Sequence, residues 1–281
     1  MTQKLTNEYL AKTGYLIEPA PVDDWRQFDE NDPVPAYFQF DWFSSRHPDL
    51  YHKFALSTDA LMDELERIVD LSGLIVADIG AGTGRSTLRA ARKAKHVFAI
   101  DPFKSVLSFN RRLTESAGLT NVTYKRESCA QSSLPDNSVD VSISSWAVMD
   151  YAEAYRITKP GGYLIFMGSA PGTLCGELTA TLASEYPTII DSVAPADVFD
   201  PAYPASEVEV AGDIWNGVPL AAPLRVRDFT FVGDYGAADE AVAVLGRFYG
   251  PKAKAYLQER GQSSISWRLR IEYCRIAKPT H

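Results

Sequence analysis

The residues best suited to ligand chemistry are two aspartates and the glycines between them. Asp78 is followed at alternate positions by Gly80, Gly82 and Gly84, and Asp101 comes later in the chain. Glycines allow a tight turn and let a bulky ligand lie against bare backbone. An acid at the later position can accept hydrogen bonds from both hydroxyls of a ribose. This spacing predicts a site for a nucleotide-like ligand.

The segments around these residues have the composition of strands and a helix. Residues 74–77 form an apolar run that predicts a buried parallel strand. The stretch RSTLRAARKA after Gly84 favours a helix, and HVFAID ends a second strand at Asp101. Strand, glycine turn and helix in this order form the front half of a nucleotide-binding βαβ unit.

The same alternation continues along the chain and predicts a parallel sheet covered on both faces. Strands are predicted at 74–79, 96–100, 121–127, 139–145 and 163–169, with a tight turn at KPGG. Helices are predicted at about 57–71, capped by Ser57 or Thr58, and at 84–94, 102–118 and 151–157. Beyond residue 169 we expect a helix at 174–186, a strand at 223–235, helices at 237–250 and 251–261, and a closing strand at 264–277.

Two segments do not follow this alternation. Residues 1–56 are rich in aromatic side chains without sustained strand or helix periodicity, and they predict an N-terminal helical cover. This cover is either a packed layer or a lid over a pocket, since aromatic walls are common in ligand sites. The second segment, an insertion at about 170–223, contains many prolines and small residues, and such insertions are usually functional or mobile.

Composition narrows the class of protein. The chain has 281 residues and a net charge of −8, which suits one large α/β domain and disfavours nucleic-acid binding. Cys129, Cys175 and Cys274 lack CxxC spacing, which argues against a disulfide framework or a zinc site and favours a cytoplasmic protein. No signal-peptide segment or membrane-length apolar run is found, and the four histidines show no metal-ligand spacing.

Four segments in order resemble the class I S-adenosylmethionine-dependent methyltransferases, in their ubiquinone/menaquinone-type small-molecule branch. These segments are VADIGAGTG, AID at 99–101, LPDNSVDVSIS and EAYRITKPGGYLIF. The resemblance implies a Rossmann-like doubly wound sheet, mostly parallel with an antiparallel C-terminal strand. It places the cofactor-binding domain at 57–281, after the N-terminal cover.

The resemblance also implies roles for individual residues toward S-adenosyl-L-methionine, whose product is S-adenosyl-L-homocysteine. The methionine part would lie on the glycine turn, the ribose on Asp101, the adenine between two short segments, and the transferring methyl beside the end of the fourth strand. The implied residues are Asp78, Gly80, Ala81, Gly82 and Gly84 for methionine, Pro102, Phe103, Cys129 and Ala130 for adenine, and Ser145 and Trp146 near the methyl. The acid that many members place at the adenine edge is missing here or displaced to Glu127.

Methyl transfer from a sulfonium mainly requires alignment of the reacting atoms. A base is needed only when the acceptor is a hydroxyl or an acidic carbon. The candidates are His47, Tyr51, Asp150 and Tyr151. His47 could instead be a surface residue before Pro48, and Asp150 could be only a helix cap.

Three alternatives stay open at this point. The first is an RNA methyltransferase, which would need a basic surface. The second is a module that binds the cofactor without catalysis, and the third is a dinucleotide-binding domain. The third is disfavoured because Arg85 replaces the glycine that packs helix on strand in G-x-G-x-x-G. We therefore predict methyl transfer to an O, N or C atom of a small organic molecule, without a membrane partner and with a homodimer left open.

Overall fold

The structure is a computed structural model that describes residues 44, 47–184 and 190–279. Most of the aromatic N-terminal segment, residues 1–43, lies outside the described residues, so its predicted role as a cover or lid stays a prediction.

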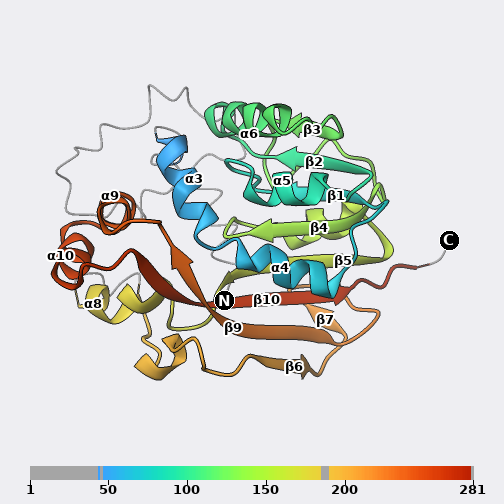
Figure 1. The fold of residues 1–281 in the computed structure, drawn as a ribbon. Helices are drawn as coiled ribbons and strands as arrows, with labels where there is room; N and C mark the ends of the chain where they lie inside the picture. The colour runs from blue at the N-terminus through green and yellow to red at the C-terminus, as the bar shows by residue number, and fades with distance from the viewer. Residues whose placement is uncertain (1–43, 45–46, 185–189, 280–281) are drawn as a thin grey trace.

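One eight-stranded sheet carries the fold, in the order β3-β2-β1-β4-β5-β10-β9-β6 (Figure 1). Strands β3 to β5 along this order are parallel, whereas β10 is antiparallel to both β5 and β9. The prediction of a mostly parallel sheet with an antiparallel C-terminal strand is confirmed. The strands are β1 (Ile75–Ile79), β2 (His96–Ile100), β3 (Val122–Lys125), β4 (Val139–Ser145), β5 (Thr158–Ser169), β6 (Ser206–Val210), β7 (Ile214–Trp215), β8 (Val218–Pro219), β9 (Leu224–Asp234) and β10 (Ser264–Arg275).

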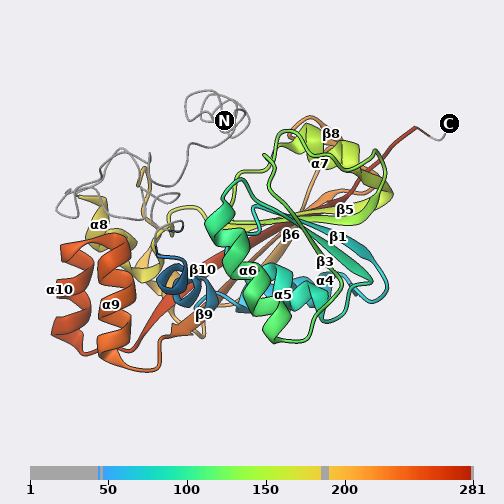
Figure 2. The ribbon, with the colours of Figure 1, turned by 90° about the horizontal axis from the view of Figure 1, so that it is seen from above.

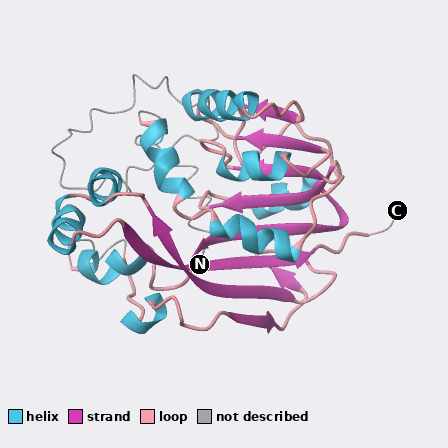
Figure 3. Cartoon of the chain, in the orientation of Figure 1, coloured by secondary structure: helices cyan, strands magenta, loops and turns pink. Residues whose placement is uncertain are grey.

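Helices cover both faces of this sheet. Figure 2 shows α4, α5 and α6 on one face and α7 with the β7–β8 hairpin on the other, while α8, α9 and α10 stand to one side. Figure 3 shows the same layers coloured by element type. The helices are α3 (Pro48–Leu56), α4 (Ala60–Ile68), α5 (Arg85–Ala91), α6 (Lys104–Ser116), α7 (Tyr151–Ile157), α8 (Thr179–Ala183), α9 (Ala238–Tyr249) and α10 (Pro251–Arg260), with 3₁₀ turns η3 (Gly176–Leu178) and η4 (Ala196–Phe199).

Each face of the sheet packs its own hydrophobic core. The larger core joins the sheet to α3, α4, α5 and α9 and includes Phe54, Phe248 and Trp267. The second core lies under α7 and the β7–β8 hairpin and includes Tyr151 and Trp215. Apolar strands that are buried on both faces read as continuous hydrophobic runs, which is why residues 74–77 predicted β1 correctly.

The predicted capping of the helix at 57–71 by Ser57 or Thr58 was wrong. The Ser57 hydroxyl donates to the Phe54 carbonyl at 2.6 Å, and the Thr58 hydroxyl donates to the Ala55 carbonyl at 2.9 Å. Both side chains therefore complete the end of the preceding helix α3, and α4 begins only at Ala60. Short hydroxyl side chains bond equally well to nearby carbonyls, so their type alone does not say which helix they serve.

The segment beyond β5 holds more strand and less helix than predicted. In place of one helix at 174–186, the structure has η3 followed by the short α8. Gly176 has φ +59°, and a Cβ there would lie 2.7 Å from the Ser266 carbonyl oxygen, so the backbone turns at this point. The insertion also contributes β6, which pairs with β9, and the β7–β8 hairpin. The KPGG stretch, predicted as a turn, lies within β5, which begins at Thr158.

Candidate functional site

The glycine turn follows β1 at the carboxyl end of the parallel strands. Gly80 has φ +72°, and a Cβ on it would lie 2.1 Å from the Cβ of Ala147. Gly84 has φ +97°, and a Cβ there would lie 2.4 Å from Oδ1 of Asn110. These two glycines are therefore required by the packing of the turn against the loop after β4 and against α6. At Gly82, with φ +51°, the nearest atom to an added Cβ is a ring carbon of Tyr51 at 3.6 Å, so the Tyr51 ring is in van der Waals range of this side of the turn.

Asp101 lies beside the glycine turn, as its spacing predicted. One carboxylate oxygen accepts a hydrogen bond from the Gly82 backbone N–H at 3.0 Å, and the other accepts from the Phe103 N–H at 2.8 Å. The β1–β2 register places the two strand ends side by side. The Asp101 carboxylate thus joins the glycine turn to the Pro102–Phe103 segment for which the resemblance implies adenine contact.

Asp78 is buried under the turn and bonded to α5. Its carboxylate accepts a hydrogen bond from the Thr87 hydroxyl at 2.6 Å, and the Asn110 amide donates to the same hydroxyl at 3.0 Å. Burial raises the pKa of Asp78 to about 6, while Thr87 and the nearby Arg85 act in the opposite direction. In the structure Asp78 therefore joins the glycine turn to α5. Ala81, which is also buried, belongs to the same turn.

Helix α3 lies against the turn and brings two side chains to it. Tyr51 approaches Gly82, and Nδ1 of His52 lies 3.1 Å from the Thr83 hydroxyl oxygen. Burial, followed by the charge of Arg85, lowers the pKa of His52, which favours the neutral imidazole. The sequence analysis proposed Tyr51 but missed His52. One feature of the sequence pointed to His52. It stands next to Tyr51 in a segment that begins with Pro48, and proline is favoured in the first turn of a helix.

His47 precedes α3 and acts there through its backbone. Its carbonyl accepts a hydrogen bond from the Tyr51 N–H at 2.9 Å, which forms the first turn of the helix. The ring is half-buried. Its candidacy as a base stays a prediction.

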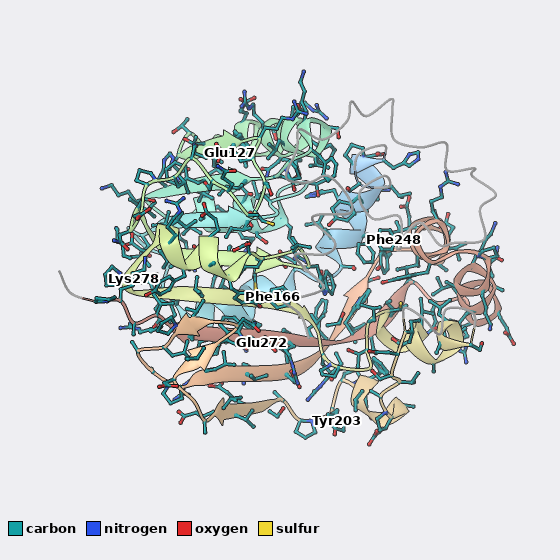
Figure 4. The ribbon with its side chains drawn as sticks, turned by 180° about the vertical axis from the view of Figure 1, so that it is seen from behind. Glu127, Phe166, Tyr203, Phe248, Glu272 and Lys278 are labelled. Carbon is teal, nitrogen blue, oxygen red and sulfur yellow. The ribbon has the colours of Figure 1, made fainter. Side chains whose placement is uncertain are left out.

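Ser145 and Trp146 lie at the end of β4, within an aromatic cluster. Trp146 has φ +52°, and its backbone N–H donates to the Met167 carbonyl at 2.8 Å. Its ring centroid lies 6.1 Å from that of Phe54 and 5.6 Å from that of Trp267, and Phe248 stacks on Phe54 at 4.0 Å. Figure 4 shows Phe248 beside α3. The cluster forms an apolar wall next to the glycine turn.

The segment predicted to contact the adenine edge is internally bonded. The Glu127 carboxylate accepts hydrogen bonds from the Ser133 N–H at 3.0 Å and from the Ser132 hydroxyl at 3.1 Å. The Ala130 N–H donates to the Ser128 hydroxyl at 3.2 Å. Burial, together with the charge of Asp150, raises the pKa of Cys129 to about 11, so this thiol stays protonated. The Glu127 carboxylate is therefore held by hydrogen bonds within its own loop.

The two candidates after β4 have structural partners. Oδ1 of Asp150 accepts from the Glu153 N–H at 2.9 Å, which makes Asp150 the N-cap of α7. The ring of Tyr151 packs edge-on against Trp215 with centroids 4.9 Å apart, in the second core. Burial raises the pKa of Tyr151. The structure therefore does not bring Tyr151 to the glycine turn. Asp150 acts as the helix cap that the sequence analysis gave as its alternative role.

No group of three or more His, Cys, Asp or Glu side chains with the arrangement of a metal site occurs within residues 44, 47–184 and 190–279. The site consists instead of backbone at the turn, the Asp101 carboxylate, the α3 side chains and the aromatic cluster. Such a set suits a ligand with a ribose and an apolar or sulfur-bearing part.

Comparisons with known proteins agree with this geometry. Residues 77–166 match a family described as a methyltransferase domain. The chain is 31% identical over 110 residues to malonyl-[acyl-carrier protein] O-methyltransferase of Yersinia pestis, covering 37% of this chain and 39% of that protein. It is 29% identical over 128 residues to phosphoethanolamine N-methyltransferase 1 of Zea mays, covering 40% of this chain and 26% of that protein.

A solved structure supports the fold over a longer range. A Bacillus halodurans protein assigned to the methyltransferases superposes with a TM-score of 0.50 at 17% identity, covering 77% of this chain and 98% of that chain. The chain spans less than half the length of the two curated relatives, 39% and 26%. Their similarity therefore concerns the domain around the glycine turn.

Proposed function

We propose that this chain, whose residues 77–166 form a class I S-adenosylmethionine-dependent methyltransferase domain, transfers a methyl group from that cofactor to a small organic acceptor. The observation that carries the proposal is the Asp101 carboxylate bonded to the Gly82 N–H at the carboxyl end of the sheet. This pair supports the proposal because a carboxylate that can accept from ribose hydroxyls and a glycine turn are the two features that hold a nucleoside with an amino-acid tail.

Two features at the turn support a bound cofactor. Gly82 carries no side chain of its own and has only the Tyr51 ring beside it, and the buried Phe103 donates its N–H to Asp101. When bound, the cofactor supplies an activated methyl on a sulfonium. We expect Gly80, Gly82, Asp101 and Phe103 to hold it. Asp78 and Gly84 support the turn from beneath.

The chain's own contribution is alignment and exclusion of water. Helix α3 covers the turn with Tyr51 and His52, and the aromatic cluster closes the neighbouring side. Fixing two reactants in one orientation removes most of the entropic part of the barrier. For an acceptor that must lose a proton, Tyr51 and the neutral His52 are the groups at the turn that we propose as bases. His47 and Asp150 remain secondary candidates.

We infer a small acceptor from the composition and the relatives together. Two relatives act, by their names, on phosphoethanolamine and on a malonyl group carried by a protein. The net charge of −8 argues against nucleic acid. The ubiquinone/menaquinone-type branch, a homodimer and a cytoplasmic location are parts of the same proposal. All three cysteines are free thiols, which suits a reducing compartment.

No helix in the described part of the chain combines the length and apolar character needed to cross a membrane. We propose that the acceptor reaches the site from solution.

Asp101→Ala tests the proposed cofactor site. Loss of a charged acceptor for two ribose hydroxyls should weaken S-adenosylhomocysteine binding by about tenfold or more, measured by titration calorimetry. Asp136→Ala, at an exposed carboxylate on the LPDNS turn, is the matched control and should bind like the wild type. Unchanged affinity in Asp101→Ala would remove this residue from the ribose role, and a wild-type chain that binds no S-adenosylhomocysteine would refute the proposed function.

A further inference from the structure

A buried arginine lies directly after the glycine turn. Arg85 is the first residue of α5, and its side chain is only 6% exposed. The guanidinium reaches between the end of α3 and the end of β4. It donates to the Ala55 carbonyl at 3.1 Å, to the Thr58 hydroxyl and to the Ser145 hydroxyl, and it lies 5.7 Å from the centroid of the Trp146 ring. Its position joins three elements that surround the proposed site.

The partners of Arg85 are neutral oxygens. Among the described residues no carboxylate lies within ion-pair distance of this guanidinium, and its Nε–H is buried without a hydrogen-bond acceptor. Arg89, one turn later on α5, shows the contrast, because it pairs with Asp59 at 2.6 Å, Asp63 at 2.6 Å and Glu66 at 3.1 Å. Acidic side chains are therefore nearby, and they form ion pairs with Arg89, the more exposed of the two arginines.

A buried cation without an ion-pair partner is energetically costly. The carboxylates of Asp59 and Asp78 act on Arg85 through their charge, without an ion pair. Burial lowers the pKa of the Arg85 guanidinium, although the group stays charged because its ordinary pKa is above 12. The carbonyl end of α3 provides partial compensation, since the C-terminus of a helix carries a partial negative charge. This compensation leaves the Nε–H without a hydrogen-bond acceptor, a place that an oxygen of a bound anion could fill.

The neighbours of Arg85 indicate which bound molecule could supply an oxygen to its Nε–H. Ser145 and Trp146 mark the end of β4, next to the proposed methyl-transfer position, and helix α3, which Arg85 meets at the Ala55 carbonyl, also brings Tyr51 against Gly82. We propose that Arg85 is the receptor for an oxyanion of carboxylate type on a molecule bound at the glycine turn. The proposal rests on the function proposed above.

Two sources can provide this oxyanion, and they share the same chemistry. One is the amino-acid carboxylate of the cofactor, and the other is an acidic group on the acceptor. An arginine binds either one through charge-assisted hydrogen bonds, which are stronger than bonds between neutral groups. The test must therefore separate a cofactor anion from an acceptor anion.

Titration calorimetry on the full chain makes this separation. S-adenosylhomocysteine carries the carboxylate, whereas 5′-methylthioadenosine has the same thioether nucleoside without it. With the cofactor as source, Arg85→Met should weaken S-adenosylhomocysteine by about tenfold or more and leave 5′-methylthioadenosine unchanged. If the acceptor supplies the oxyanion, Arg85→Met should bind S-adenosylhomocysteine and 5′-methylthioadenosine as the wild type does. Malonate should then bind the wild type loaded with S-adenosylhomocysteine but not the loaded variant.

Two outcomes overturn the proposal. One is that Arg85→Met binds all three probes as the wild type does, and the other is that it loses S-adenosylhomocysteine and 5′-methylthioadenosine equally, which would make Arg85 a purely structural clamp of α3. Arg89→Met, with the exposed network removed, should bind like the wild type. If Arg85→Met does not fold, as judged by circular dichroism, Arg85→Lys retains the charge and gives the same comparison with a smaller ratio.

The two proposals fail in different ways. A wild-type chain that binds neither nucleoside refutes the proposed function. A wild-type chain that binds S-adenosylhomocysteine and its carboxyl methyl ester with equal affinity, and that binds no malonate when loaded, refutes the role of Arg85 while leaving the function intact.

Discussion

Asp78 is a buried carboxylate whose protonation is coupled to folding. Its pKa is raised to about 6 by burial, with Thr87 as its hydrogen-bond donor. The folded chain therefore holds a proton at Asp78 more tightly than the unfolded chain does. The resulting stabilisation is present at low pH and is lost as the pH rises through about 6.

Asp78→Asn mimics the protonated side chain and should remove this pH dependence. Relative to the wild type, the variant should show a similar free energy of unfolding near about pH 3.5, below the ordinary pKa of an aspartate, and an advantage of roughly 1–3 kcal/mol near about pH 8. Urea unfolding at a series of pH values measures this difference. Asp213→Asn, at an exposed carboxylate, is the control, and parallel curves for wild type and Asp78→Asn would contradict the raised pKa.

At the same scale, residue types predicted the turn better than they predicted its surroundings. The glycine spacing and Asp101 indicated their mutual contact because backbone freedom and a carboxylate acceptor are properties of single residues. The role of His52 was not predictable in this way. It depends on how α3 packs over Thr83, and contacts between distant segments, such as the stacking of Phe54 on Phe248, set that packing. The same holds for Arg85, whose burial comes from α3 and β4 together.

At the scale of elements, Phe54 is the most buried side chain of α3, which Arg85 also holds through the Ala55 carbonyl. Phe54 is 2% exposed and stacks on Phe248 of α9 with ring centroids 4.0 Å apart. It also meets Trp267 of β10 edge-on at 5.8 Å. This packing sets the position of Tyr51 and His52 over the turn, so α3 links the stability of the fold to the shape of the site.

Phe54→Ala should therefore destabilise the protein by about 3–5 kcal/mol, the usual cost of a large cavity in a core. It should also weaken S-adenosylhomocysteine binding because α3 loses its anchor. Leu56→Ala, two residues later on the same helix at a side chain 44% exposed, should cost less than about 0.5 kcal/mol. Urea midpoints and calorimetry check both effects, and similar losses in the two variants would exclude Phe54 as the anchor.

Among the elements, those with strong periodicity were predicted well. Strands β1, β2 and β4 and helices α9 and α10 lie where their patterns indicated. Strands β9 and β10 also lie at predicted strands, and they pair antiparallel. The insertion was harder because its prolines suggested loops. Strand β6 depends on its pairing with β9, where Glu207 and Glu209 of β6 form ion pairs with Arg225. Pairing between distant segments is invisible to local propensity.

At the scale of the whole molecule, the two hydrophobic cores leave the glycine turn at the carboxyl end of the sheet, where open α/β sheets bind ligands. The aromatic cluster extends the first core up to this end. Fold and site therefore share residues, and the same packing that stabilises the sheet also forms one wall of the site.

The charge distribution separates a small acceptor from RNA. The densest basic stretch, RAARKAK at 89–95, would be the natural phosphate contact of an RNA methyltransferase. In the structure Arg89 pairs with Asp59, Asp63 and Glu66, and Lys93 pairs with Glu66 at 2.7 Å. Acidic side chains on and just before α4 thus neutralise Arg89 and Lys93, two of the four cations of this stretch.

We therefore expect the full chain to retain no RNA on a filter at micromolar protein and physiological salt, because a net charge of −8 repels phosphate. The assay uses total RNA with and without S-adenosylhomocysteine and a salt titration from low to physiological concentration. The triple variant Asp59→Asn/Asp63→Asn/Glu66→Gln releases Arg89 and Lys93, and it should acquire weak, salt-sensitive retention that reports on a working assay. Retention by the wild type with a steep dependence on salt would instead favour an RNA substrate, since counterion release produces that slope.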